Sequence, residues 1–255
     1  MEDYAPIEGV KGFSIESTPS ETNLYYKDNG SAGLVIKIQP HGKPPKTGLY
    51  LSQQLKSLVK DKKVLDLGTG ESAILALFGA RYGAKAVVAC DVDKDILNAA
   101  KDNSDLNNLT NIKVIQSNLF TNINEKFDLI VSNPPQLPML SPSRHDSGGQ
   151  DGRLILERII NQSPKYLNER GQLVLLVFDF LGVDRSFNHS PSLFELLKNN
   201  GFSPTVLSTK KRLINPKGQT YKNLHHITET YPKYTFTQIG KNLYHYIMVV
   251  KAELL

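Results

Sequence analysis

Residues 63–70, KVLDLGTG, decide the fold of this chain. Val64, Leu65 and Leu67 predict a short buried strand, because an apolar run that ends in turn residues is typical of strands in parallel sheets. The glycines after it predict a tight turn, and residues 72–82 predict a helix. A strand, a glycine turn and a helix in this order form the start of a mononucleotide-binding α/β unit.

The polar residues of this stretch indicate a ligand. Asp66 precedes Gly68 and Gly70 in an Asp-x-Gly-x-Gly pattern. Glycine allows a bound cofactor to approach the backbone closely, since any Cβ would occupy that space. A carboxylate at this point can hold a cationic group of the ligand beside the turn. On this stretch alone, an ordinary βα turn of another α/β protein stays open as the alternative.

Strands and helices alternate after this turn. We expect strands at 86–89, 112–115, 127–131, 172–178, 202–209 and 244–250, and helices at 96–107, 154–162 and 192–200. Asp95 is the expected N-cap of the first of these helices, and Gly201 is expected to end the last. Before the turn, residues 1–22 predict an arm or loop, 23–38 a β-hairpin with an Asp-Asn-Gly turn, and 50–59 a helix. The alternation predicts an α/β fold, with a mostly parallel sheet and helices on both faces.

Polar residues stand at three of the predicted strand ends, where ligands bind to sheets of this kind. These residues are Asp66, Asp91 and Asn133. Asp91 closes a strand about twenty residues after the glycines, and an acid at this spacing can accept hydrogen bonds from the hydroxyls of a cofactor ribose. A capping or surface role is the alternative for Asp91, and the strand before it favours ribose binding.

The most specific signal is residues 133–136, Asn-Pro-Pro-Gln. Two prolines fix the backbone and remove two N–H donors, so the neighbouring carbonyls are held rigidly. The Asn133 side chain beside a fixed carbonyl provides two acceptors that converge on one point, to which a substrate –NH2 group can donate both hydrogens. A rigid turn after a buried strand is the alternative. The presence of Asp66 and Asp91 upstream favours the amine-binding interpretation.

These motifs resemble those of a known enzyme family. Residues 66–70, DLGTG, are similar to the first motif of the class I S-adenosylmethionine-dependent methyltransferases. Residues 133–136 resemble the Asn-Pro-Pro-Tyr motif of members that methylate glutamine side chains or nucleobase amines. Residues 148–152, GGQDG, look like the Gly-Gly-x-Asp-Gly loop of the release-factor glutamine methyltransferases, and Thr47 stands where that family has a Pro-rich threonine segment. The resemblance covers roughly residues 44–180 and, more loosely, the final strand.

The resemblance implies a Rossmann-like class I methyltransferase fold. Its sheet would have seven mostly parallel strands, helices on both faces and an antiparallel last strand. An N-terminal arm and β-hairpin region over 1–46 would precede a catalytic domain over 47–255. The cofactor would be S-adenosylmethionine, bound by Thr47, Asp66, Gly68, Thr69, Gly70, Asp91, Val92, Asn118, Leu119 and Asn133. The catalytic residues would be Asn133, Pro134, Pro135 and Gln136, and the Asn118 amide oxygen would meet the adenine amino group.

The chain departs from the family pattern in ways that leave the acceptor open. Glu71 stands where many relatives have a third glycine, and Gln136 replaces the aromatic residue that would pack against a flat amide or base. A short hairpin region stands where the release-factor enzymes have an N-terminal helical domain. A protein glutamine and a nucleic-acid amine are therefore equally good candidates, and a small-molecule acceptor stays open.

Charge and composition add expectations about partners. Residues 185–255 carry ten Lys and Arg and three Glu, whereas residues 1–184 carry twenty Lys and Arg and twenty-two Asp and Glu. The basic C-terminal third suits an acidic partner such as RNA, DNA or an acidic protein, and simple solubility is the alternative. His225 and His226 are expected in a solvated loop over 218–228. No exposed apolar helix face stands out, which leaves the oligomeric state open.

The same features favour a cytoplasmic protein without metal or membrane anchoring. Cys90 is the only cysteine, so no intrachain disulfide and no cysteine metal cluster is expected. The N-terminus is polar and acidic, unlike a signal peptide. The longest apolar run, residues 173–178, is far shorter than the roughly 20 residues that span a bilayer.

Two other functions compete with methyl transfer. A nicotinamide-dependent oxidoreductase is one, because Gly68, Gly70 and Ala73 fit a dinucleotide fingerprint and Asp91 fits its ribose acid. Asp66 argues against it, since dinucleotide folds usually have an apolar residue there. The other is an inactive methyltransferase-like module that binds RNA or protein through the basic third. The intact Asn-Pro-Pro argues against loss of activity, while Gln136 leaves room for it.

Overall fold

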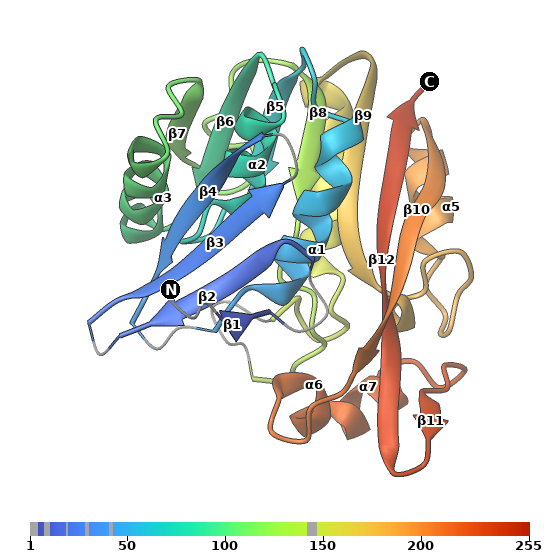
Figure 1. The fold of residues 1–255 in the computed structure, drawn as a ribbon. Helices are drawn as coiled ribbons and strands as arrows, with labels where there is room; N and C mark the ends of the chain where they lie inside the picture. The colour runs from blue at the N-terminus through green and yellow to red at the C-terminus, as the bar shows by residue number, and fades with distance from the viewer. Residues whose placement is uncertain (1–4, 8–10, 19, 29–30, 41–42, 142–146) are drawn as a thin grey trace. The chain divides into compact units, whose positions relative to one another are not determined.

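The computed structural model describes residues 5–7, 11–18, 20–28, 31–40, 43–141 and 147–255 (Figure 1). The chain forms two compact units, Met1–Val131 and Ser132–Leu255. The fold is α/β, with a mixed sheet of mostly parallel strands flanked by helices and a separate antiparallel sheet at the N-terminus. This confirms the fold class expected from the alternation of strands and helices.

The first unit begins with an antiparallel sheet of four strands in chain order. They are β1 (Ala5–Pro6), β2 (Phe13–Ser17), β3 (Thr22–Asp28) and β4 (Ser31–Ile38). Strands β3 and β4 confirm the predicted hairpin, while its turn residues Asn29 and Gly30 lie outside the described residues. The sequence predicts an arm or loop over residues 1–22. This is wrong where the segment forms strands β1 and β2. Phe13 pairs with Tyr26 and packs against its ring at 4.7 Å between centroids, an apolar contact that stabilises a strand of only five residues.

Parallel strands form the rest of the first unit. The elements are α1 (Lys46–Gln54), η1 (Leu55–Ser57), β5 (Lys63–Leu67), α2 (Ile74–Arg81), β6 (Ala86–Asp91), α3 (Lys94–Leu106), β7 (Ile112–Gln116) and β8 (Phe127–Ser132). Strand β5 lies between β8 and β6, and β7 pairs with β6, all in parallel. The α3 helix is capped by Asp93, whose side chain accepts from Asp95 N, so the prediction of Asp95 as the cap is wrong by two residues. Asp93 caps because its backbone is extended while Asp95 already lies in the helix.

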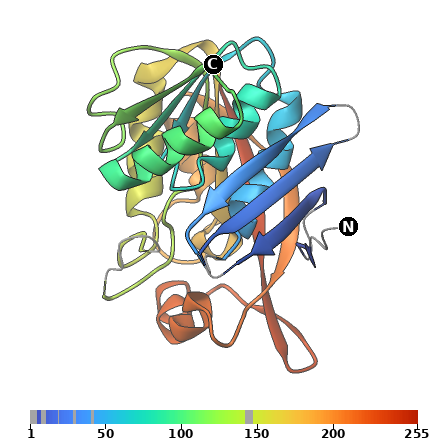
Figure 2. The same cartoon turned by 60° about the vertical axis from the view of Figure 1, so that its left-hand side comes forward.

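Helix α3 lies beside the N-terminal sheet (Figure 2), and two of its asparagines bind the backbone of β4. Asn103 accepts a hydrogen bond from Lys37 N at 2.8 Å and donates one to Lys37 O at 2.9 Å. Asn107 does the same with Val35, at 2.9 and 2.7 Å. A side-chain amide has one donor and one acceptor group side by side, like a neighbouring strand, so these residues satisfy the open edge of the N-terminal sheet.

The second unit is built on an antiparallel ladder. Its elements are α4 (Leu154–Gln162), η2 (Ser163–Tyr166), β9 (Leu167–Phe178), η3 (Asp179–Leu181), α5 (Leu193–Asn199), β10 (Phe202–Leu213), α6 (Gln219–Lys222), α7 (Leu224–Thr230), β11 (Thr237–Ile239) and β12 (Asn242–Leu254). Strand β12 pairs with β9, β10 and β11. Helix α4 has the predicted bounds. Ser192 and Glu195 form a capping box at the start of α5, and Gly201 follows it at φ +80°, as expected.

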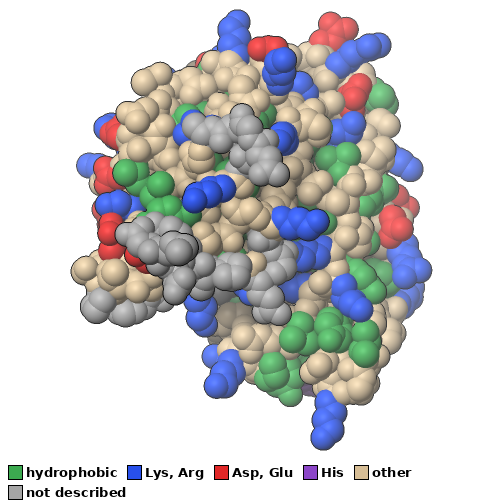
Figure 3. All heavy atoms as spheres, in the orientation of Figure 1, with side chains coloured by type: hydrophobic (Ala, Val, Ile, Leu, Met, Phe, Trp, Pro, Cys, Tyr) green, Lys and Arg blue, Asp and Glu red, His purple; other side chains and the backbone are tan. Residues whose placement is uncertain are grey.

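The sequence expectation is less accurate towards the C-terminus. Strand β10 continues past the predicted residue 209 to Leu213, because its polar end pairs with β12 as far as Tyr244. Strand β12 continues past the predicted residue 250 to Leu254, because its last residues pair with the start of β10. The solvated loop expected over 218–228 is wrong, since α6 and α7 occupy it. Exposed basic residues stand on this part of the chain, and Figure 3 shows Lys and Arg side chains scattered over the visible face. No helix in the described ranges is long and apolar enough to cross a membrane.

Candidate functional site

Asp66 is buried completely at the end of β5. Its Oδ2 accepts hydrogen bonds from Thr69 Oγ1 at 2.6 Å and from Ala76 N at 3.0 Å. Its Oδ1 is also buried and has no hydrogen-bond partner within the described part of the chain. Burial raises the pKa of Asp66 to about 7, against the opposing effect of the two hydrogen bonds. The carboxyl group is therefore half satisfied by the protein and has one acceptor available to a ligand.

The glycine turn after Asp66 is held open by its backbone conformation. Gly68 has φ +78° and Gly70 has φ +64°, values that favour glycine. A Cβ built on either glycine would meet no atom within 4 Å. Gly68 N and Thr69 N both donate to Cys90 O at 2.9 Å, which fixes the turn to the end of β6. The turn is therefore fixed in position and has open space beside its glycines, so a cofactor can approach its backbone closely.

Asp91 joins this turn to the end of β6. Its Oδ2 accepts from Gly70 N at 3.2 Å, and its Oδ1 accepts from Asp93 N at 3.2 Å. Each carboxylate oxygen can accept a second hydrogen bond, so the half-buried group can still receive ribose hydroxyls. Val92 follows with 59% of its surface exposed.

The loop after β7 is attached to the same place. Ser117 N donates to Asp91 O at 2.8 Å, and Ser117 Oγ donates to Leu119 O at 2.6 Å. Asn118 is exposed, and Leu119 has φ +53°, a left-handed conformation that is costly for a leucine. Strained backbone of this kind is commonly found at binding sites. The first unit thus brings Asp66, the glycine turn, Asp91 and the Asn118 loop together, as the sequence predicts.

Thr47 lies in the first turn of α1 and is half-buried. The next residue, Gly48, approaches the start of α2, where a Cβ on Gly48 would lie 3.0 Å from Ile74 Cγ2. Helix α1 therefore packs closely against the helix that follows the glycine turn. Thr47 lies 19 residues before Asp66 in the sequence, so it is the only residue assigned to the cofactor that precedes β5.

The observed groups fit S-adenosylmethionine. The cofactor carries cationic groups, for which the unpartnered Oδ1 of Asp66 is an acceptor. It also carries ribose hydroxyls, which suit Asp91, and an adenine ring, which suits the exposed Val92 side chain. The open space at Gly68 and Gly70 leaves room for a ligand next to the backbone.

In the second unit, Gln136 fastens the Asn-Pro-Pro-Gln loop to the end of β9. Its side chain is 3% exposed. Nε2 donates to Leu176 O at 2.8 Å and to Pro134 O at 3.3 Å, and Oε1 accepts from Phe178 N at 2.7 Å. Gln136 is therefore an internal clamp that sets the position of the Pro134 carbonyl. Asn133 and Pro135 are half-buried and Pro134 is buried.

The glycine-rich loop over 148–152 packs directly on this clamp. A Cβ on Gly148 would meet Gln136 Cα at 2.7 Å, and one on Gly152 would meet Gln136 O at 2.7 Å. Gly148 N donates to Leu137 O, and Met139 N donates to Gly149 O, both at 3.0 Å. The two motifs singled out from the sequence thus form one rigid assembly within the second unit.

Arg153 is a structural residue of this assembly that the sequence analysis misses. It is 1% exposed, and its guanidinium donates to Glu157 Oε1 at 2.9 Å and to Pro191 O at 2.7 Å. The expectation for His226 is wrong, because it lies on helix α7, not in a loop, and its Nε2 is 2.7 Å from Gln150 O. The attachments to Pro191 and Gln150 could not be found from local patterns, since these partners lie 38 and 76 residues away.

A buried polar cluster next to Phe178 is also absent from the sequence prediction. Asp179 accepts from Tyr234 Oη at 2.8 Å and from Tyr246 N at 2.9 Å. The His245 ring lies 3.7 Å from the same carboxylate, and burial lowers the pKa of His245 although Asp179 opposes this. The cluster fixes the end of β9, to which Gln136 binds.

Comparison with known proteins agrees with these observations. The family model of the methyltransferase small domain matches residues 42–204. A protein of Methanocaldococcus jannaschii, named as a putative protein N5-glutamine methyltransferase, is 35% identical over 164 residues, which are 61% of this chain and 82% of that protein. Ribosomal protein L11 methyltransferase of Lactobacillus acidophilus is 34% identical over 195 residues, which are 74% of this chain and 54% of that protein. The chain thus spans most of the first relative and about half of the second.

A solved structure has a similar fold. The T. thermophilus 16S rRNA N2 G1207 methyltransferase, in complex with AdoMet and guanosine, superposes with a TM-score of 0.56. The alignment covers 98% of this chain and 52% of the other, at 19% identity. At this identity the likeness concerns the fold alone.

Proposed function

The chain belongs to the methyltransferase small domain family, and we propose that it transfers a methyl group to a nitrogen atom bound by Asn133 and Pro134. Methyltransferase activity and S-adenosylmethionine as cofactor follow from the family. The nitrogen acceptor and the residues that act on it are our proposal. The family match also decides against the nicotinamide-dependent alternative, in keeping with the buried acid Asp66 at the end of β5.

S-adenosylmethionine supplies a methyl group on a positively charged sulfur, already activated for displacement. On the protein side, Asp66 Oδ1 would accept a hydrogen bond from a cationic group of the cofactor, whose charge would favour the ionised carboxylate. Asp91 would accept hydrogen bonds from the ribose. Val92, Asn118 and Leu119 would contact the adenine. Thr47, Gly68, Thr69 and Gly70 would complete the site through backbone and hydroxyl contacts.

Asn133 and Pro134 would bind the acceptor. The Asn133 side-chain oxygen and the Pro134 carbonyl would each accept one hydrogen of an –NH2 group, which directs the nitrogen lone pair away from both. The same two oxygens would stabilise the positive charge that develops on nitrogen. Correct orientation alone can supply up to about 7–11 kcal/mol of a reaction barrier. An amide or aromatic amine becomes acidic once methylated, so it can lose its proton without a strong base.

The observation that carries this proposal is the clamp made by Gln136. Its Nε2 lies 3.3 Å from Pro134 O, and its other bonds tie that carbonyl to the backbone of β9. A carbonyl oxygen has two lone pairs, so Pro134 O can accept from Gln136 and from a substrate amine together. We therefore assign Gln136 a positioning role beside Asn133, Pro134 and Pro135.

Two acceptor classes are consistent with this arrangement. A protein glutamine side chain is one, and the name of the Methanocaldococcus jannaschii relative supports it. A nucleic-acid amine is the other, supported by the basic C-terminal residues. Both present a planar –NH2 group to the same pair of acceptors.

The experiment uses S-adenosylmethionine labelled in the methyl group. The purified chain is incubated with protein, RNA and small-molecule fractions of a cell lysate, and labelled products are hydrolysed and identified by mass spectrometry. We expect label on nitrogen, as N5-methylglutamine or as an N-methylated base. Label found only on oxygen, sulfur or carbon would refute the nitrogen assignment, and no label in any fraction would favour the inactive-module alternative.

A further inference from the structure

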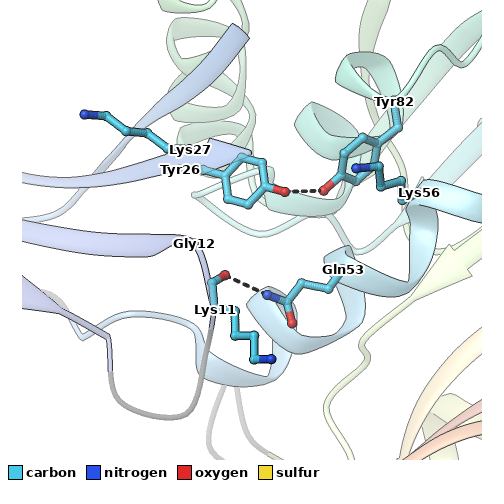
Figure 4. A pocket seen from close by; sticks show the side chains of 7 residues that line it. All are labelled: Lys11, Gly12, Tyr26, Lys27, Gln53, Lys56 and Tyr82. Carbon is cyan, nitrogen blue, oxygen red and sulfur yellow. Dashed lines mark hydrogen bonds between the residues drawn. The ribbon is translucent and has the colours of Figure 1, made fainter. Parts of the chain in front are cut away.

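A basic cavity of about 520 Å³ lies in the first unit (Figure 4). It is lined by Lys11, Gly12, Tyr26, Lys27, Gln53, Lys56 and Tyr82. Three of these residues are lysines, and none of the described lining residues is acidic. Residues 1–131 as a whole carry fifteen Lys and Arg and sixteen Asp and Glu. Lys11 and Lys56 therefore place two positive charges at a lining in which no described residue is acidic, while the Lys27 side chain extends away from the Tyr26 and Tyr82 hydroxyls.

The lining of the cavity contains a hydrogen-bonded pair of tyrosine hydroxyls. Tyr26 Oη lies 2.9 Å from Tyr82 Oη, and Figure 4 shows the two hydroxyls meeting inside the lining. Phe78 packs against both rings, at 4.7 and 5.3 Å between centroids, and Phe13 packs against Tyr26 at 4.7 Å. Because one hydroxyl donates to the other, the pair leaves one O–H donor for a ligand, and the packing of the rings fixes its position.

The wall that carries Lys11 is also fixed. Gly12 has φ +77°, and a Cβ there would lie 3.0 Å from Lys27 O. Lys27 N donates to Gly12 O at 3.0 Å, and Gln53 Nε2 donates to Lys11 O at 2.8 Å. The turn is thus bonded to both β3 and α1. On the other side, Lys56 Nζ stands 5.8 Å from the centre of the Tyr82 ring.

We propose that this cavity binds a phosphate ester, contributed by a nucleic-acid strand or by a small phosphorylated molecule. Lysine ammonium groups bind phosphate as point charges, and hydroxyls donate to its oxygens. The volume falls within the roughly 300–1,000 Å³ of typical ligand sites. Since Phe78 packs against both tyrosine rings and Lys56 Nζ stands over the Tyr82 ring, recognition would depend on the phosphate and not on a stacked base. This site lies beyond the proposed reaction and does not depend on it.

The test measures binding by the full chain without S-adenosylmethionine. The probes are a fluorescein-labelled single-stranded RNA of mixed sequence, followed by anisotropy, and uridine 5′-monophosphate, followed by calorimetry. Figure 4 shows Lys27 extending away from the hydroxyl pair, so the variant is Lys11→Glu with Lys56→Glu. The control is Lys113→Glu with Lys126→Glu, which changes the charge equally at exposed lysines of the same unit outside the lining.

We expect the cavity variant to bind at least one probe about tenfold more weakly than the control does. If RNA is the ligand, the salt dependence should fall by roughly 0.7 in log–log slope for each phosphate contact that the substitutions remove. Binding of RNA alone identifies a nucleic-acid source, and binding of the nucleotide alone identifies a small ester. Equal affinities in the cavity variant and the control, or no binding of either probe, would overturn the proposal.

A second variant keeps all the lysines. Tyr26→Phe with Tyr82→Phe removes both hydroxyls but preserves the aromatic packing, and circular dichroism would verify the fold. We expect severalfold weaker binding of the same probe. Unchanged affinity in this variant would mean that general positive charge, and not this cavity, attracts the probe, and would contradict the proposal.

Discussion

Asp66 has a fully buried carboxyl group with one oxygen bonded twice and the other without a partner among the described residues. Isolated buried charge is costly, and the pKa of Asp66 rises to about 7. A cationic group of the cofactor beside Oδ1 would compensate this cost. The position of this acid at the end of β5 is predictable from residues 66–70. Its unsatisfied oxygen is not, because that depends on how Thr69 and Ala76 fold around the carboxyl group.

The raised pKa makes a testable contribution to stability. An unfolded aspartate ionises near pH 4, about 3.9 in model peptides, and folded Asp66 near 7. The folded state therefore binds more protons between these values, and the free energy of unfolding contributed by Asp66 falls as pH rises from about 4 to about 7. Asp66→Asn should flatten that dependence in urea titrations at several pH values. An unchanged pH dependence would contradict the role of Asp66.

Gln136 provides a second prediction at this scale. Gln136→Ala leaves Leu176 O and Phe178 N unsatisfied, which costs about 1–3 kcal/mol for each buried group. Methyl transfer should fall at least tenfold, while the Kd for S-adenosylmethionine, measured by calorimetry, stays within about twofold, because the hydrogen bonds of the Gln136 side chain lie in the second unit. Gln219→Ala, at an exposed position, is the control. If Gln136→Ala instead weakened cofactor binding and kept normal turnover, the positioning role of Gln136 would be contradicted.

At the scale of elements, predictions succeed where the chain carries local signals. Helix α4 ends before Pro164, and α5 has its capping box and Gly201, so their bounds follow from the sequence. Strands β1 and β2 are missed because they are short and depend on pairing with β3. The clamp of Gln136 on β9 is missed for the same reason, since its partners lie 40 and 42 residues away.

The attachment of β4 to α3 gives a prediction for this scale. Asn103→Ala with Asn107→Ala removes four hydrogen bonds to Lys37 and Val35. The unfolding free energy should fall by about 2–6 kcal/mol, from roughly 0.5–1.5 kcal/mol per bond, and the amide hydrogens of Lys37 and Val35 should exchange faster. Asn98→Ala, exposed on the same helix, should change neither quantity. Unchanged exchange in the double variant would show that the sheet is held in another way.

At the scale of the molecule, the α/β class and the family are predictable because the motifs at 66–70 and 133–136 are local. The division into compact units at Val131 and Ser132 is not, since the contacts that define it are long-range. The predicted boundary between the N-terminal region and the catalytic domain, at residues 46 and 47, stays a prediction. The family match begins nearby, at residue 42. The identity of the acceptor does not follow from the sequence, because Gln136, which replaces the aromatic residue of the family motif, is buried in this chain.

The central claim is that Asn133 acts chiefly on the acceptor nitrogen, whereas Asp91 acts on the cofactor alone. The measurement that tests it most directly compares Asn133→Ala with Asp91→Ala, recording the Kd for S-adenosylmethionine and methyl transfer to the lysate fraction that accepts label. We predict that Asn133→Ala loses transfer by at least a hundredfold with near-normal cofactor affinity, and that Asp91→Ala loses cofactor affinity. Near-normal transfer by Asn133→Ala, with the cofactor bound as in the unaltered chain, would contradict the account.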